Sequence, residues 1–275
     1  MNFSIKLLTI SFYLLLPTLS LAQSYSGSIE GVKMNIVIGD VSKQGTEAVI
    51  VPHFKGEVST GGVGGAIIRT GGGDAFKEAQ QIMNRDQAMR EFGAAFLTKS
   101  TGTNSNIINI VSVGSGEDKE YATIRQSVLN GLKVAEKNGI KSVSVPALGT
   151  GIIGQLTNEQ SAHAIMSAVA EFRRDGGKIN EINIVIYGDK AQHKDFVSAY
   201  DRKTYAVNLN AARTSGERAI DPDRWAKAMA KDGDGRYAAP AQVEQAVVRA
   251  ATEPNPAPTI RQRVGAFFKG FRGSK

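Results

Sequence analysis

Strand-like and helix-like hydrophobic patterns alternate along the chain from about residue 33 to residue 203. Short β-branched runs bounded by turn residues predict strands at Met34–Ile38, Ala48–Val51, Ala94–Leu97, Ile107–Val113, Ser142–Val145 and Ile182–Tyr187. Apolar residues at helical spacing predict helices at Gly64–Met83, Tyr121–Lys137, Asn158–Arg174 and Gln192–Tyr200. Alternation of this kind is typical of an α/β domain with helices on both faces of a sheet. In such folds ligands bind at the carboxyl ends of the strands.

The N-terminal segment has a different pattern. Lys6 precedes an apolar run from Leu7 to Leu16, which is followed by Pro17 and by Ser20-Leu21-Ala22. A basic start, an apolar core and a small-residue cleavage site are typical of a secretory signal peptide. The apolar stretch from Leu7 to Ala22 spans about 16 residues, fewer than the ~20 that span a bilayer. We therefore predict a signal peptide over residues 1–22, no transmembrane segment in the mature chain, and a periplasmic or secreted location; an uncleaved anchor is the alternative.

The composition changes after about residue 207. Residues 207–275 are rich in alanine and predict a helical, partly disordered extension that follows the domain at residues 33–203. Its last segment carries several basic residues and no acidic one, beside Phe267 and Phe268. Such a segment suits an acidic membrane surface or a partner protein. The alternative is a helix that packs on its own domain or stays disordered.

Charge and composition narrow the ligand class only in part. The chain has 275 residues, 33 basic and 26 acidic, with a net charge of +7, which favours anionic ligands in general. It contains no cysteine, which excludes disulfides and thiolate metal sites. His163 and His193 lack partners at metal-ligand spacing, and Val243 stands where a calcium loop opening at Asp232 requires Glu. We predict neither a metal site nor a cofactor.

Two glycine-rich loops carry the main chemical signal, and each lies between a predicted strand and a predicted helix. Residues 59–67 read Ser-Thr-Gly-Gly-Val-Gly-Gly-Ala-Ile, and residues 146–154 read Pro-Ala-Leu-Gly-Thr-Gly-Ile-Ile-Gly. Glycines let backbone N–H groups approach an anion closely, so two loops at one sheet edge suit a diphosphate, although glycine turns also serve simple chain reversal. Neither loop has the dinucleotide or P-loop spacing. The candidate binding residues are Gly61, Gly62, Val63, Gly64, Gly149, Thr150, Gly151, Ile152 and Ile153.

Taken in order, Gly39-Asp40-Val41, the strand Ala48–Val51 and the two loops resemble the macro domain family over about 170 residues. The resemblance implies a three-layer α/β/α fold with a mixed central sheet. Macro domains bind ADP-ribose, and some hydrolyse ADP-ribosyl esters or Appr-1″-p. The resemblance further implies that Asp40, beside Val41, accepts a hydrogen bond from the adenine amino group and that Tyr187 stacks on adenine. It places Phe54 and Ile153 against the distal ribose.

The departures from the family pattern concern the reacting end of the ligand. Hydrolytic members end the second strand in Asn-Ala-Ala-Asn, whereas residues 51–54 here read Val-Pro-His-Phe. Phe54 has no hydrogen bond to offer a ribose hydroxyl or a water. Gly64 stands where the family often has Asp, and Ile68 stands where it commonly has His. Hydrolysis needs a positioned, activated water, and these three polar groups are missing.

We therefore predict a module that binds ADP-ribose or ADP-ribosylated partners outside the cytoplasm, without efficient turnover. One alternative is an ADP-ribosylhydrolase that uses His53 or Glu57 with a substrate-bound water. Of these residues His53 is the candidate catalytic group. The other alternative is an interaction protein whose basic C-terminal segment carries the function.

Overall fold

The computed structural model describes residues 24–205, except residues 103, 105, 117, 118, 152, 153 and 204. The predicted signal peptide, the extension at 207–275 with Asp232 and Val243, and the candidate residues Ile152 and Ile153 lie outside the described residues. Within the described part of the chain, no helix has both the length and the apolar character needed to cross a membrane.

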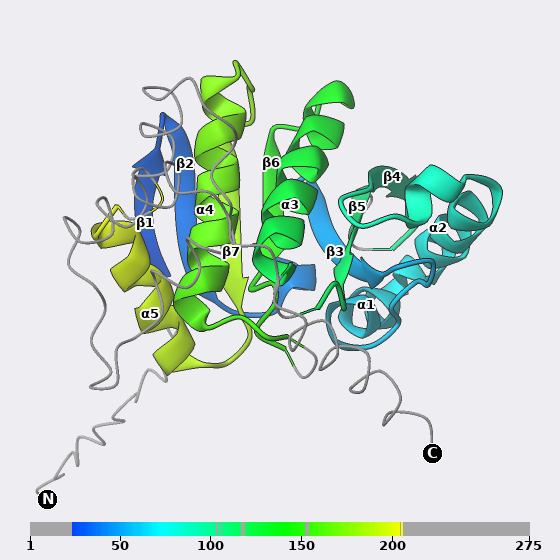
Figure 1. Ribbon diagram of the computed structural model, residues 1–275, viewed down its shortest axis with the longest axis horizontal. Coiled ribbons are helices and arrows are strands. Elements are labelled where there is room, and N and C mark those ends of the chain that lie inside the picture. The colour runs from blue at the N-terminus through cyan, green and yellow to red at the C-terminus, as the bar shows by residue number, and fades with distance from the viewer. Residues whose placement is uncertain are drawn as a thin grey trace, which may run out of the picture.

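The described domain is built on a mixed sheet of seven strands in the order β1-β2-β7-β6-β3-β5-β4 (Figure 1). The five inner strands run parallel, and β1 and β4 pair antiparallel with the strands beside them. The α/β class and the mixed sheet are confirmed. The strands are β1 (Ser24–Ile29), β2 (Val32–Ile38), β3 (Ala48–Phe54), β4 (Ala95–Lys99), β5 (Asn106–Val113), β6 (Ser142–Pro146) and β7 (Glu181–Ile186).

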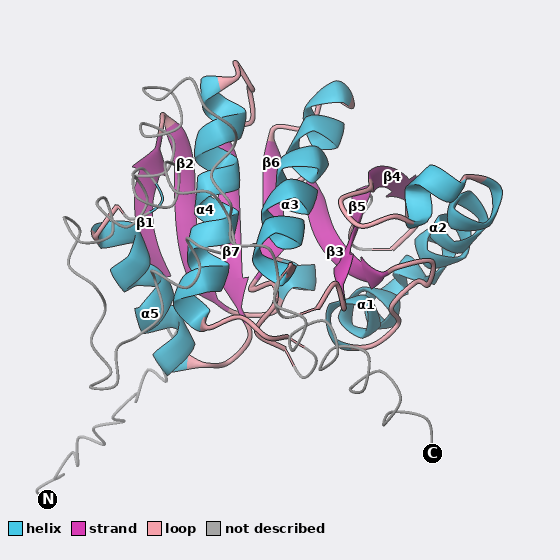
Figure 2. Ribbon diagram, in the orientation of Figure 1, coloured by secondary structure: helices cyan, strands magenta, loops and turns pink. Residues whose placement is uncertain are grey.

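Helices follow most of the strands (Figure 2). They are α1 (Gly62–Ile67), α2 (Gly73–Arg85), α3 (Glu120–Lys137), α4 (Asn158–Arg174) and α5 (Lys190–Asp201), with short 3-10 turns at Val41–Lys43 and Gln87–Arg90. The single helix expected at Gly64–Met83 is divided by a π turn, η2 (Ile68–Gly72). Gly71 has a φ of +94° within that turn, which only glycine adopts freely, so the helix bends there.

Strand β1 has no counterpart among the strands expected from the sequence. Its residues are mostly polar, because β1 is an edge strand whose outer positions face solvent. The Tyr200 hydroxyl on α5 accepts a hydrogen bond from Ser28 N at 2.6 Å and donates one to Ser28 O at 2.9 Å. A Cβ on Gly27 would lie 2.2 Å from that hydroxyl oxygen, so a side chain there would displace Tyr200 from Ser28. Among the described residues, the sheet thus includes a strand at Ser24–Ile29, before residue 33.

Two apolar layers enclose the sheet. On β3, Ala48 and Ile50 belong to the cluster under α3, α4 and α5, whereas Val49 and Val51 belong to the cluster under α2. This alternation follows from the two-residue repeat of a strand that is covered on both faces. Figure 1 shows α3 and α4 side by side over one face of the sheet.

The position of the site follows from the connections of β3 and β6, which are neighbours in the sheet. The chain leaves β3 toward α1 and α2 on one face, and leaves β6 toward α4 on the other. Loops that diverge to opposite faces leave a crevice at the carboxyl ends of the two strands. Both glycine-rich loops lie at this crevice.

Leu132 on α3 is fully buried in the larger cluster, and the next residue, Lys133, is exposed. We expect Leu132→Ala to lower the free energy of unfolding by roughly 2–5 kcal/mol, because it removes buried methyl groups and leaves a cavity. Lys133→Ala on the same helix should change it by less than about 0.5 kcal/mol. Denaturant titration of both variants checks this, and equal effects would contradict the assigned core.

Candidate functional site

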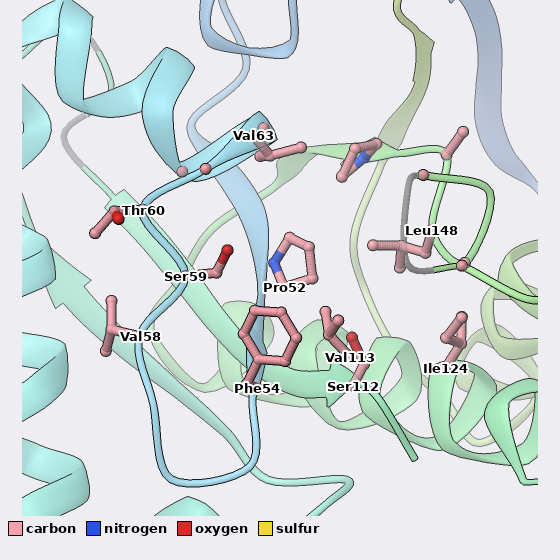
Figure 3. A pocket seen from close by; sticks show the side chains of 18 of the residues that line it. Pro52, Phe54, Val58, Ser59, Thr60, Val63, Ser112, Val113, Ile124 and Leu148 are labelled. Carbon is pink, nitrogen blue, oxygen red and sulfur yellow. The ribbon is translucent and has the colours of Figure 1, made fainter. Parts of the chain in front are cut away.

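A cavity of about 570 Å³ opens between the two glycine-rich loops. Its walls come from the end of β3, residues 57–64, the end of β5, the first turn of α3 and the segment after β6. Figure 3 shows Pro52 and Phe54 of β3 between the first loop and Leu148 of the second. Of the residues expected to bind a ligand, Gly61, Gly62, Val63, Gly64, Gly149 and Gly151 line this cavity.

The first glycine-rich loop has no room for a side chain at one glycine and open space beside two others. A Cβ on Gly64 would lie 2.2 Å from the carbonyl oxygen of Ser59, so a side chain there would force the backbone apart. Gly61 and Gly62 have no atom within 4 Å of such a Cβ position. No side chain caps α1, whose first residue is Gly62, so its first N–H groups remain free for a ligand.

The second loop closes on itself. Gly154 N donates to Gly151 O at 2.9 Å, and a Cβ on Gly154 would lie 2.1 Å from Gly149 O. Gly149 has a φ of +75° and packs directly over Ile124 of α3. The Thr150 hydroxyl donates to Ala147 O at 3.3 Å and accepts from Gln192 at 2.8 Å. Its side chain therefore stabilises the loop and does not line the cavity.

Asp40 and Tyr187 lie together at the same sheet edge, beyond the lining of the cavity. They follow the paired residues Ile38 of β2 and Ile186 of β7. Tyr187 is 82% exposed, which leaves its ring free for stacking. Val41 is buried and packs in the cluster under α2, so its side chain serves the core.

Asp40 is an ionised hydrogen-bond acceptor. Its Oδ1 accepts from Ser42 N at 2.9 Å and from the Ser42 hydroxyl at 2.8 Å. Partial burial acts to raise the pKa of Asp40, but these two hydrogen bonds, with Lys43 and Arg69 nearby, outweigh it and hold the pKa below its usual value. A low pKa keeps the carboxylate available to a donor such as an amino group.

His53 is placed away from the cavity. It is fully buried, while its neighbours Pro52 and Phe54 line the cavity. Ser59 N donates to Nδ1 at 3.0 Å, so the proton is on Nε2, which donates to Asn109 Oδ1 at 2.8 Å. Burial lowers the pKa of His53 to about 4, although the Asn109 contact acts against this. Both ring nitrogens are engaged, and His53 fixes the start of the first loop.

The end of the cavity beside Phe54 is largely apolar. Phe54, Val113, Ile124 and Leu148 contribute carbon surfaces there (Figure 3). Phe54 thus occupies the position at which the sequence comparison with hydrolytic macro domains expects an amide, and it offers a ligand only packing. Glu57 also lines the cavity, with its side chain exposed.

A second carboxyl in the cavity has no counterpart in the sequence-based predictions. Glu120, the first residue of α3, is 3% exposed and lines the cavity. Its Oε2 accepts from Gln155 N at 2.8 Å. Burial raises the pKa of Glu120, and the Gln155 hydrogen bond offsets part of this rise. An acidic residue in a first helical turn is ordinary in sequence, so only the fold reveals its burial.

Comparisons with known proteins agree with this architecture. Residues 53–165 match the family model described as Macro domain. O-acetyl-ADP-ribose deacetylase 1 of Pantoea vagans is 28% identical over 159 residues, which cover 56% of this chain and 91% of that protein. A macrodomain of Oceanobacillus iheyensis with ADP has a TM-score of 0.59 at 20% identity, covering 66% of this chain and 97% of its own. A variant of it with ADPR has a TM-score of 0.58 at 18% identity, covering 65% and 97%.

The solved structures show that the described domain has the macro domain fold, and the family match and the relative support the macro domain family for it.

The burial of neutral His53 makes stability depend on pH. Its pKa is about 4 in the folded protein and ~6.5 when unfolded, so between these values the unfolded chain binds more protons. The contribution of neutral His53 to the free energy of unfolding is complete above pH 6.5 and is lost as the pH falls toward 4. We expect His53 to account for about 2 kcal/mol of lost stability between pH 7 and pH 5. In denaturant titrations, His53→Gln should show a smaller loss over this range than wild type, and equal losses would contradict the assignment.

Proposed function

We propose that this macro domain binds ADP-ribose, either free or attached to a macromolecule, in the cavity between its two glycine-rich loops. One observation carries the proposal: two glycine-rich loops, with open space beside Gly61, Gly62 and Gly151, face each other across a single cavity. Backbone on both sides of such a gap suits a diphosphate, which needs many N–H donors at close range. The Oceanobacillus iheyensis macrodomain with ADP, and its variant with ADPR, support this ligand class.

The proposed ligand extends along the carboxyl edge of the sheet. The diphosphate lies against residues 61–64 and 149–151, and adenine lies toward Asp40 and Tyr187 at the ends of β2 and β7. Asp40 has the acceptor that an adenine amino group requires, and the exposed Tyr187 ring supplies a stacking surface of the kind worth about 1–3 kcal/mol per base. The distal ribose then meets the apolar end beside Phe54.

We also propose that the domain acts outside the cytoplasm. The N-terminal pattern of residues 1–22 supports export. The first described strand, β1, starts at Ser24, so cleavage after Ala22 leaves every described strand intact. N-terminal sequencing of the protein recovered from the periplasm or medium tests this proposal. A mature chain that begins at Gln23 supports it, and an uncleaved chain that stays in the cytoplasm contradicts it.

Hydrolysis of an ADP-ribosyl ester is the second candidate function. The buried carboxyl of Glu120 in the cavity favours it, because a desolvated acid at a binding site is a common general base. A relative named O-acetyl-ADP-ribose deacetylase points to the same class of reaction.

Calorimetric titration of the full chain with ADP-ribose tests binding. We expect heat of binding and a thermal stabilisation that grows with ligand concentration, equivalent to about 2.7 kcal/mol at a ligand concentration of 100 times Kd. No heat and no stabilisation would reject the proposal and favour a function carried by the basic C-terminal segment.

A glycine pair tests the loop directly. Gly61 lines the cavity and caps α1, and Gly73 begins α2 away from the cavity; a Cβ on either meets open space. We expect Gly61→Val to raise Kd roughly tenfold or more, a loss of ~1.4 kcal/mol or more, because the side chain occupies the space proposed for phosphate. Gly73→Val should leave Kd unchanged. Equal Kd values in both variants would place the ligand elsewhere.

A further inference from the structure

We propose that Glu120 is the general base of an ester hydrolysis in this cavity. Glu120 on α3 would then supply the polar group that β3 lacks, because Phe54 stands where hydrolytic macro domains have Asn. The inference rests on the proposed function, because it requires an ADP-ribosyl ester in the same cavity. Neither the glycine-rich loops nor the residues singled out from the sequence assign any role to Glu120.

The position of Glu120 within α3 directs its carboxyl to the ligand space. Glu120 and Ile124 are one helical turn apart and therefore share a face of the helix. Ile124 supports the second loop at Gly149, and both Glu120 and Ile124 line the cavity. Glu120 thus lies in the wall of the cavity, on the face of α3 that supports the second loop.

The hydrogen bonds of Glu120 leave one oxygen for chemistry. Oε2 is held by Gln155 N at 2.8 Å, and no hydrogen bond from a described residue reaches Oε1. Glu120 also forms no ion pair within the described part of the chain. A carboxyl that is 3% exposed without a cation beside it is costly to keep, and such groups concentrate at functional sites.

The environment also makes this carboxylate a stronger base than an exposed one. Burial raises the pKa of Glu120, which brings its basicity closer to neutral pH. Glu57, the other carboxyl of the cavity, is exposed. The apolar side chains of Phe54, Ile124 and Leu148 limit the bulk water around the reacting end.

The proposed step uses only water and the ester. Oε1 of the Glu120 carboxylate takes a proton from water as the water oxygen bonds to the ester carbonyl carbon, which gives a tetrahedral oxyanion. The carbonyl re-forms as the bond from that carbon to the ribose oxygen breaks, and the proton on Glu120 goes to the ribose oxygen. The products are a carboxylic acid and ADP-ribose, and Glu120 is again a carboxylate.

A purely structural role is the competing interpretation, because the Gln155 hydrogen bond by itself anchors the segment after the second loop. Glu120→Gln separates the two roles, since the amide oxygen still accepts from Gln155 N but has no useful basicity. Glu136→Gln is the matched control. Glu136 lies near the other end of α3, outside the cavity lining, and likewise accepts a backbone hydrogen bond, from Lys178 N at 2.8 Å.

The experiment measures acetate release from O-acetyl-ADP-ribose by the full chain and, for each variant, calorimetric binding of ADP-ribose. We expect turnover by wild type and by Glu136→Gln. In Glu120→Gln, kcat should fall by about 100-fold or more, while Kd for ADP-ribose stays within about twofold of wild type. A lower kcat with an unchanged Kd would show that the reaction needs the basicity of Glu120 and that ligand binding does not.

Three outcomes would overturn the inference. Wild type that binds ADP-ribose without releasing acetate would reject hydrolysis and leave the proposed binding function standing. Unchanged kcat in Glu120→Gln would make Glu120 a loop anchor only. If Glu120→Gln fails to fold, Glu120→Ala with added formate replaces it; restored acetate release supports the base, and none rejects it. Absence of ADP-ribose binding by wild type is the separate result that rejects the proposed function.

Discussion

The site depends on the adjacency of β3 and β6 and on the opposite directions in which the chain leaves them. Each strand is buried on both faces, so the sheet is fixed by its two apolar clusters. The first loop must run to α1 on one side, and the second must run to α4 on the other. Neither loop can fill the space between them, and the cavity is a result of this topology.

Within that constraint, the sequence predicted what depends on local pattern. Hydrophobic periodicity predicts the inner strands and the helices after β5, β6 and β7. The clustered glycines between a predicted strand and a predicted helix indicate the two loops with exposed backbone. Strand β1 was not predicted, because an edge strand with polar outer positions has no apolar repeat. It is held in place by the hydrogen bonds between Ser28 and the Tyr200 hydroxyl. The bend at Gly71 was not predicted, because glycine is also common in simple turns.

The chemistry of the site was harder to predict, because burial is a property of the fold. His53 is conspicuous in the sequence, yet on β3 it is fully buried outside the cavity lining, with both ring nitrogens hydrogen-bonded. Glu120 reads as an ordinary first-turn acid, yet the crossing of α3 beneath the second loop buries it in the cavity. Burial in the cavity thus depends on contacts between elements far apart in the sequence, which no short motif records.

The fastening of β1 by Tyr200 has a consequence for how the domain forms. The two partners, Ser28 and Tyr200, lie at opposite ends of the described chain, 172 positions apart. A contact of such long sequence separation forms late, since nearly the whole polypeptide must be present and ordered before the loop closes. β1, the first strand of the described chain, is thus among the last of the described strands to be locked in place.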